Sequence, residues 1–199
     1  MPIPKLIHQT IASRRDLPDF LIANAAKLQE MNPAWEYCLH EDQDCADFIR
    51  EHYGADIYRL YQSIHPAYGA ARADFFRYLL LYKKGGVYLD IKSGCDVPLD
   101  QVIAEDDEFL LSHWRNPEDG HHPAFGVVAE LQQWHIIAGP GHPFLAEVIA
   151  RVADNLRNYD PLSHGVGKRA VLQMTGPIAY TRAIEPLLPR HKHRFFEAE

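Results

Sequence analysis

One continuous segment, residues 67–92, constrains the fold of this chain more than any other part of the sequence. Residues 67–84 (AYGAARADFFRYLLLYKK) are rich in Ala, Leu and Arg and end in basic residues, and Gly85 and Gly86 follow them. This pattern predicts a long helix that stops at the two glycines. The next residues, VYLDIK, predict a strand. A helix that leads directly into a strand is typical of folds in which helices cover a sheet.

The same alternation continues along the rest of the chain. Further strands are predicted at 4–10, 35–40, 108–113, 134–138 and 193–197, and further helices at 17–31, 42–54, 143–156 and 176–188. Residues 116–126 and 164–169 predict loops. We therefore expect an α/β fold, with a Rossmann-like, mostly parallel sheet flanked by helices in a single domain over residues 1–199. Such sheets bind their ligands beyond the carboxyl ends of the strands.

Composition narrows the class of partner and the compartment. The 199 residues are 47% hydrophobic and carry a formal net charge of −7, which fits a globular domain and argues against nucleic acid as a partner. The cysteines Cys38, Cys45 and Cys95 show no CxxC spacing, which favours a reducing compartment. The longest apolar run is too short to span a bilayer. We expect a cytoplasmic protein, with peripheral association at the inner membrane face as an open alternative.

Two charged residues share one face of the long predicted helix. Asp74 and Arg77 are three positions apart, so their side chains are neighbours on the helix surface. In isolation this spacing favours an intrahelical ion pair that contributes a few tenths of a kcal/mol. The alternative is a pair that belongs to a binding site.

The strand after this helix ends in further polar residues. Side chains alternate along a strand, so Tyr88, Asp90 and Lys92 are expected on one side of it. A solvated strand end would explain them, and so would a ligand site at the carboxyl end of the sheet. Spacing alone does not decide between the two.

Four segments, taken in order, carry a family resemblance. IPKLIHQT, NPAWEYCLHED, AARADFFRYLLLYKKGGVYLDIKSGCDVPLD and TGPIAYTRAI together resemble glycosyltransferase family 32, the group with an Asp-X-Asp sugar-binding region, and are distantly similar to glucosylating bacterial toxins. The resemblance extends from Ile3 to about Ile184. It implies a GT-A fold, a UDP- or GDP-linked sugar donor, Mn²⁺ or Mg²⁺, and transfer with retention of anomeric configuration.

The resemblance also implies roles for individual residues. Ile7, His8 and Gln9 would lie under the nucleobase, and the acceptor or sugar side would include Gln133, Trp134 and His135. Trp134 offers a ring on which a sugar can stack, although a core position explains it equally well. The full set expected to bind the nucleotide sugar is Ile7, His8, Gln9, Asp74, Arg77, Tyr88, Asp90 and Lys92.

One position departs from the Asp-X-Asp pattern. Asp90 matches the first Asp, but Lys92 stands where the second Asp would ligate the metal. An ammonium group cannot ligate a cation, although it can supply positive charge to a diphosphate. Three interpretations follow: Lys92 replaces part of the metal's charge, Asp96 joins Asp90 as a metal ligand, or the site has lost its transferase activity.

These observations predict a glycosyltransferase that moves a sugar from a nucleotide donor to a glycan or lipid-linked acceptor in polysaccharide or glycoconjugate synthesis. The alternative is a non-catalytic nucleotide-sugar-binding or partner subunit on the same fold. A zinc hydrolase is not favoured, because the twelve histidines include no HExxH motif. The sequence indicates no catalytic base.

Overall fold

The computed structural model describes residues 1–15, 17–114 and 129–198. Its strands are β1 Leu6–Ile11, β2 Glu36–Glu41, β3 Gly86–Leu89, β4 Phe109–Leu111, β5 His135–Ala138 and β6 Arg194–Phe195. They form one sheet in the order β2-β1-β3-β5-β4-β6. β1 pairs in parallel with β2 and β3, and β4 with β6, whereas β5 is antiparallel to β3 and β4. The predicted mostly parallel α/β sheet is confirmed.

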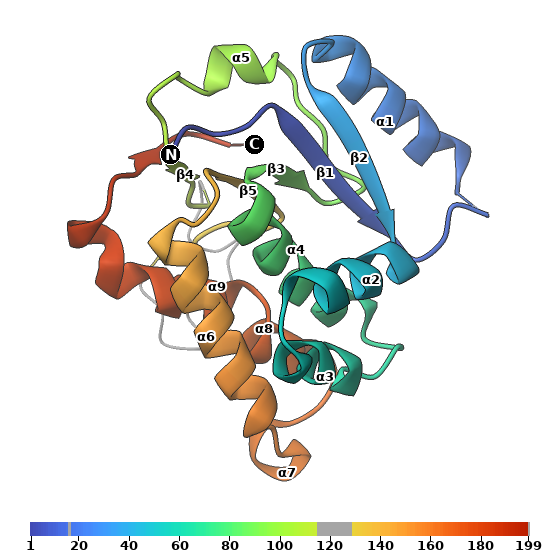
Figure 1. The fold of residues 1–199 in the computed structure, drawn as a ribbon, viewed down its shortest axis with the longest axis vertical. Coiled ribbons are helices and arrows are strands. Elements are labelled where there is room, and N and C mark those ends of the chain that lie inside the picture. Colours follow the sequence, from blue (N-terminus) through green and yellow to red (C-terminus); the bar gives the residue numbers. More distant parts are fainter. Residues whose placement is uncertain (16, 115–128, 199) are drawn as a thin grey trace.

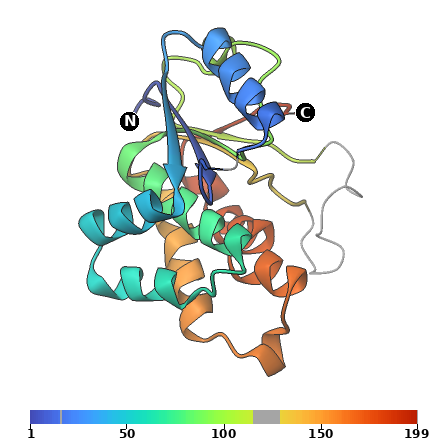
Figure 2. The ribbon, with the colours of Figure 1, turned by 90° about the vertical axis from the view of Figure 1, so that its right-hand side faces the viewer.

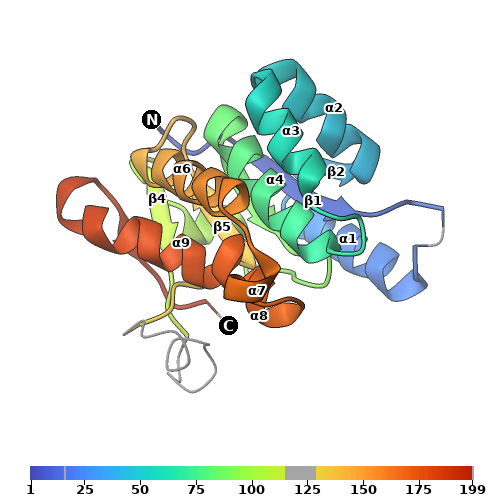
Figure 3. The ribbon, with the colours of Figure 1, turned by 90° about the horizontal axis from the view of Figure 1, so that it is seen from below.

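Helices cover both faces of this sheet. They are α1 Asp19–Met31, α2 Asp42–His52, α3 Ala55–Ser63, α4 Gly69–Lys84, α5 Leu99–Val102, α6 Pro143–Arg157, α7 Pro161–His164, α8 Lys168–Met174 and α9 Pro177–Ile184, followed by a 3-10 turn, Glu185–Arg190. Figures 1 and 2 show α1 and α5 on one side and the other helices on the opposite side. Seen from below, α4, α6 and α9 lie side by side (Figure 3).

Each face has its own apolar core, because successive side chains of a strand point to opposite faces. Tyr88 and Ile136 point to the larger core, which α4, α6 and α9 cover. Val87 and Ile137 point to the smaller core, which Leu28 of α1 and Leu99 of α5 complete. The sheet is therefore buried on both sides, and its edges are the exposed places where polar side chains can gather.

The predicted stop between the long helix and its strand is confirmed, and its geometry requires glycine. Gly85 and Gly86 have φ values of +66° and +103°. A side chain at Gly86 would place its Cβ 2.6 Å from the carbonyl oxygen of Leu6, and one at Gly85 would meet Pro140 at 2.7 Å. The two glycines let α4 turn back onto the sheet, so that the N-terminal half of α4 lies at the edge where β3 ends.

Two local predictions differ from the structure. The strand predicted through Lys92 ends at Leu89: the Asp90 N–H still bonds to Trp134 O, and then Ser93 N–H bonds back to Asp90 O at 2.7 Å and closes a turn. Strand alternation therefore does not govern the positions of Asp90 and Lys92. The loop predicted at 164–169 instead contains the end of α7 and the start of α8. The loop predicted at 116–126 lies outside the described residues.

Candidate active site

The candidate site lies where β3 ends, and its centre is a buried arginine of α4. The Arg77 side chain is only 4% exposed, and its Nη2 lies 3.0 Å from Asp90 and 3.2 Å from Asp74. Asp90 is 42% exposed, so it presents this charge pair to solvent. The intrahelical ion pair predicted from the spacing of Asp74 and Arg77 is present, but the core of the domain encloses both side chains, so the pair is not a weak surface pair.

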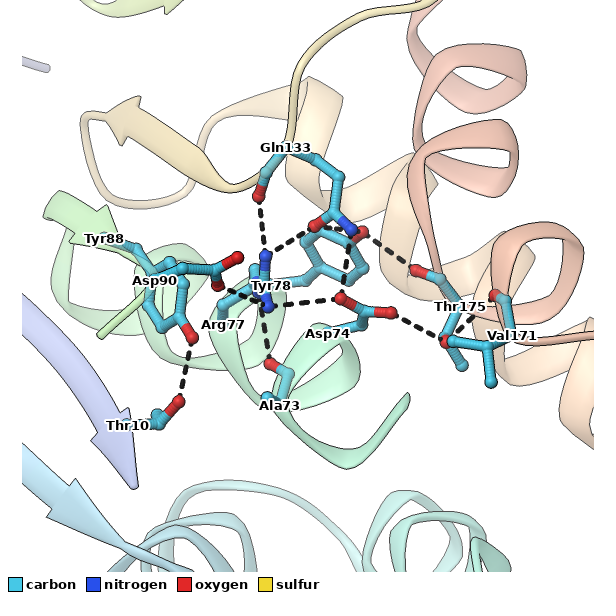
Figure 4. Close-up of polar contacts among 10 residues, drawn as sticks. All are labelled: Thr10, Ala73, Asp74, Arg77, Tyr78, Tyr88, Asp90, Gln133, Val171 and Thr175. Carbon is cyan, nitrogen blue, oxygen red and sulfur yellow. Dashed lines mark hydrogen bonds and ion pairs between the residues drawn. The ribbon is translucent and has the colours of Figure 1, made fainter. Parts of the chain in front are cut away.

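Arg77 is fixed on every side (Figure 4). A guanidinium group has five N–H donors. In Arg77 these face Ala73 O at 3.3 Å, Gln133 O and Oε1 at 2.7 Å each, and the carboxylates of Asp74 and Asp90. The group also lies 4.4 Å over the ring of Tyr88. Arg77 therefore holds Asp90 in place, and a ligand that needed an N–H of Arg77 would have to displace one of these contacts.

Asp74 is the buried counterpart of this arginine. Gln133 Nε2 and Thr175 Oγ1 each donate to its carboxylate at 3.0 Å. Burial raises the pKa of Asp74, while Arg77 and the two hydrogen bonds oppose that rise. Burial likewise lowers the pKa of Arg77, but Asp90, Tyr88 and Asp74 outweigh it and raise that pKa. The arginine therefore stays charged beside its two carboxylates.

An open cavity of about 490 Å³ lies against this network, and we call it the Asp90 pocket. The end of β1, the first turns of α4 and the turn after β3 surround it. This volume falls within the usual range for small-molecule sites. Its lining includes Thr10, Ile11, Tyr61, Gly69, Ala73, Arg77, Tyr88, Asp90, Lys92 and Ser93.

A second cavity, of about 400 Å³, adjoins the first, and we call it the Lys27 pocket. Lys92 and Ser93 line both cavities. Asp96 lines the Lys27 pocket but not the Asp90 pocket. The lining of the Lys27 pocket includes Asn24, Lys27, Lys92, Ser93, Asp96 and Trp134.

The site offers few ligands for a metal ion. Among the described residues, no three His, Cys, Asp or Glu side chains are grouped so that they could hold a metal. Asp90 and Asp42 are the carboxylates that line the Asp90 pocket, and Arg77 already pairs with Asp90. So few carboxylates fit a divalent cation that substrate phosphates and water hold in large part, and do not fit a cation held by protein alone.

The three residues predicted under a nucleobase have separate environments. Ile7 and His8 are buried. The residues of β1 that line the Asp90 pocket are Thr10 and Ile11. The His8 ring contacts His40 at 3.2 Å and the backbone oxygen that precedes β3, and burial lowers its pKa to about 3. Gln9 donates to Asp90 O at 3.1 Å, so it holds the backbone of the site. Contact of residues 7–9 with a base stays a prediction.

The three residues predicted on the acceptor side also lie in different environments. Gln133 is part of the Arg77 network, and Trp134 forms a wall of the Lys27 pocket. His135 is buried, bonds to Ser112 Oγ at 2.8 Å, and has a pKa that burial lowers to about 4. Thr175 was not predicted, although it opens the segment TGPIAYTRAI that carries part of the resemblance.

Several known proteins are similar to this chain in sequence. Residues 18–109 match the family described as "Glycosyltransferase sugar-binding region containing DXD motif". Over 79% of its length the chain is 29% identical to inositol phosphoceramide mannosyltransferase 3 of Schizosaccharomyces pombe, and over 92% it is 27% identical to the initiation-specific alpha-1,6-mannosyltransferase of Candida albicans. The chain spans 39% and 52% of these two relatives, respectively. The resemblance predicted from the four segments is confirmed.

Two solved structures show the same fold. The PaToxG glycosyltransferase superimposes with a TM-score of 0.66 at 16% identity, over 94% of this chain and 71% of that one. The UDP-bound glycosyltransferase domain of the YGT toxin gives 0.64 at 10% identity, over 98% and 80%. The predicted GT-A-type fold is confirmed. No helix in the described part of the chain has the length and apolar character needed to cross a membrane.

Proposed function

Because this chain is a relative of the glycosyltransferases with a DXD sugar-binding region, we propose that it transfers a sugar from a nucleotide-sugar donor to a hydroxyl group of a glycan or lipid-linked acceptor. The observation that carries the proposal is the buried Arg77, which fixes Asp90 at the mouth of the Asp90 pocket. In sheets of this kind, ligands bind at the carboxyl ends of strands. The mannosyltransferase names of the relatives support mannose as the sugar.

In this proposal the donor diphosphate lies beside Asp90 and Lys92. Lys92 is exposed and has no partner among the described residues, so its ammonium group is available to a phosphate. A divalent cation bound with the donor would take Asp90 as its protein ligand and supply further charge to the leaving diphosphate. Lys92 would supply part of that charge itself, which makes turnover weakly dependent on added metal.

The remaining contribution of the protein is placement. Arg77 and Gln9 fix the side chain and the backbone of Asp90, so the donor meets a preformed site. Transfer with retention needs no separate protein base, because the leaving diphosphate can accept the proton of the acceptor hydroxyl on the same face. We include retention in the proposal on this ground.

We also propose that the acceptor is presented at a membrane surface. The names of relatives as inositol phosphoceramide mannosyltransferases support a phosphate-bearing lipid acceptor. On the chain itself, Leu162 and Val166 are 97% and 64% exposed, and the Tyr159 hydroxyl bonds to Gly165 O and closes the turn that carries them. The exposed basic residues Lys168 and Arg169 follow this turn. Apolar tips beside basic residues suit an anionic bilayer.

The test is sugar transfer by the purified chain from UDP- and GDP-linked sugars to lipid-linked acceptors, with Mn²⁺ and with EDTA. We expect Asp90→Asn to abolish turnover and weaken nucleotide binding. We expect Lys92→Ala to reduce turnover sharply, with little rescue by Mn²⁺. If the parent is inert and Lys92→Asp creates a Mn²⁺-stimulated enzyme, the charge-replacement model is wrong.

Lys92 also motivates the second candidate, a non-catalytic nucleotide-sugar-binding subunit. Tight binding of UDP or GDP without any transfer or donor hydrolysis would favour that candidate over the transferase. For the membrane proposal, co-sedimentation with phosphatidylcholine vesicles should rise when phosphatidylserine is added, and Leu162→Asp should reverse the rise. Equal sedimentation of parent and variant would refute it.

A further inference from the structure

The Lys27 pocket is a built cavity beside the donor site. Asn24 of α1 donates through Nδ2 to Ile91 O at 3.2 Å and to Ser93 O at 2.9 Å, which ties the helix to the turn after β3. Gly94 keeps this turn close to α1, because a Cβ at that position would lie 3.1 Å from Asn24 Oδ1. Trp134 forms a further wall of the cavity. The cavity therefore has a fixed shape, and flexible surface side chains alone do not define it.

The polar groups of this pocket favour an anionic ligand. Lys27 and Lys92 both line it, and in the described part of the chain neither ammonium group has a hydrogen-bond or ion-pair partner. Asp96 contributes one carboxylate, so positive charge exceeds negative charge by one. Two ammonium groups attract a phosphate, which can accept hydrogen bonds from both.

The same pocket also has groups that suit hydroxyls. The Trp134 indole N–H has no partner among the described residues, and an indole ring offers a face on which a polyol or sugar can pack. The Asp96 carboxylate can accept hydrogen bonds from hydroxyl groups. A ligand that carries both a phosphate and several hydroxyls would use all four side chains.

The position of the pocket gives this ligand a role. Lys92 and Ser93 line both cavities, so a ligand in the Lys27 pocket would lie next to a donor bound in the Asp90 pocket. We propose that the Lys27 pocket binds the phosphorylated polyol group of the acceptor and presents its hydroxyl to the donor in the Asp90 pocket. This inference rests on the proposed transferase function and adds the seat and the chemical class of the acceptor.

Direct binding to the complete chain tests the proposal without any turnover. We would titrate inositol 1-phosphate, inositol and inorganic phosphate separately by calorimetry, each with and without saturating UDP. Inositol 1-phosphate should bind more tightly than either component. Of the four side chains that would hold it, only Lys92 also lines the Asp90 pocket, so saturating UDP should weaken this binding without abolishing it. Lys27→Glu should weaken this binding about tenfold, which corresponds to about 1.4 kcal/mol. The matched control is Lys84→Glu, because Lys84 is an exposed lysine at the far end of α4 and should leave the affinity unchanged.

Several results would overturn the inference. Complete, competitive displacement by UDP would place the phosphate in the Asp90 pocket, and equal affinities for inositol 1-phosphate and inorganic phosphate would indicate an adventitious ion only. Unchanged affinity in Lys27→Glu would also exclude the pocket. If Lys27→Glu still transfers sugar and its KM for a phosphorylated acceptor is unaltered, the inference about the Lys27 pocket is wrong, while the proposed transferase stands. Failure of donor binding and transfer, with inositol 1-phosphate still bound, would end the proposed transferase alone.

Discussion

Replacing Arg77 by lysine separates the shape of the guanidinium group from its charge. Lysine keeps the positive charge but has three N–H donors where arginine has five, so at least two of the contacts described above are lost. The partners are buried or partly buried carbonyls and carboxylates, and each bond to the charged group contributes about 1.5 kcal/mol. Arg77→Lys should therefore lower the free energy of unfolding by about 3 kcal/mol. In a domain of this size that corresponds to a fall in Tm of roughly 6–12 °C.

The chain offers a matched control for this substitution. Arg59 pairs with Asp56 at the same helical spacing as Arg77 with Asp74, but these side chains are 71% and 76% exposed. Exposed pairs contribute little, so Arg59→Lys should change Tm by no more than about 1 °C. Differential scanning calorimetry of the parent and both variants gives the comparison. If the two variants melt at the same temperature, the five-donor arrangement does not hold the site, and the reasoning about Arg77 fails.

Three further predictions concern the same framework. Thr175→Val removes a hydrogen bond to the buried Asp74 carboxylate without a change of shape, so urea unfolding should show a loss of about 2 kcal/mol, and no loss would refute the bond. His8 has a folded-state pKa of about 3 against 6.5 unfolded, so the folded state binds fewer protons and stability falls as pH drops below 6.5. At pH 5.5 the share of His8 in this loss should be about 1.4 kcal/mol, so His8→Asn should lose less than the parent by about this amount, while the share of the buried His135 remains. Gly86→Ala combines an unfavourable φ with a steric clash and should cost about 3 kcal/mol, whereas Gly54→Ala, in open space, should be nearly neutral in the same assay.

Local chemistry explains which elements could be predicted. The helix predicted at 67–84 corresponds to α4, because its composition and the glycines at its end act within a few residues of each other. The three-residue spacing of Asp74 and Arg77 follows from any helix at that place. The burial of the pair does not follow from spacing, because it depends on which elements cover α4.

Long-range contacts explain what the sequence left open. The Asp90 N–H continues the pairing beyond β3 by bonding to Trp134 O, a partner that strand propensity does not identify, and the turn closed by the Ser93 N–H then ends the pairing. Thr175 reaches Asp74 from 101 positions away in the chain, so no spacing rule connects them. The Lys27 pocket likewise joins α1 to the turn after β3, which are distant in sequence and adjacent only in the fold.

The contacts of Arg77 and Asp74 join segments that are far apart in the chain, so they form only when the whole domain is folded. The contacting residues are separated by 59 positions between Gln133 and Asp74 and by 101 between Thr175 and Asp74. A partly folded chain in which α4, Gln133 or Thr175 is out of place cannot hold Arg77 and Asp90 in the arrangement described. A nucleotide that recognises this arrangement would therefore bind only the fully assembled domain, and would slow hydrogen exchange in the core of the sheet as much as at the site itself. Nucleotide occupancy would then report the quality of folding, with no reporter group attached to the protein.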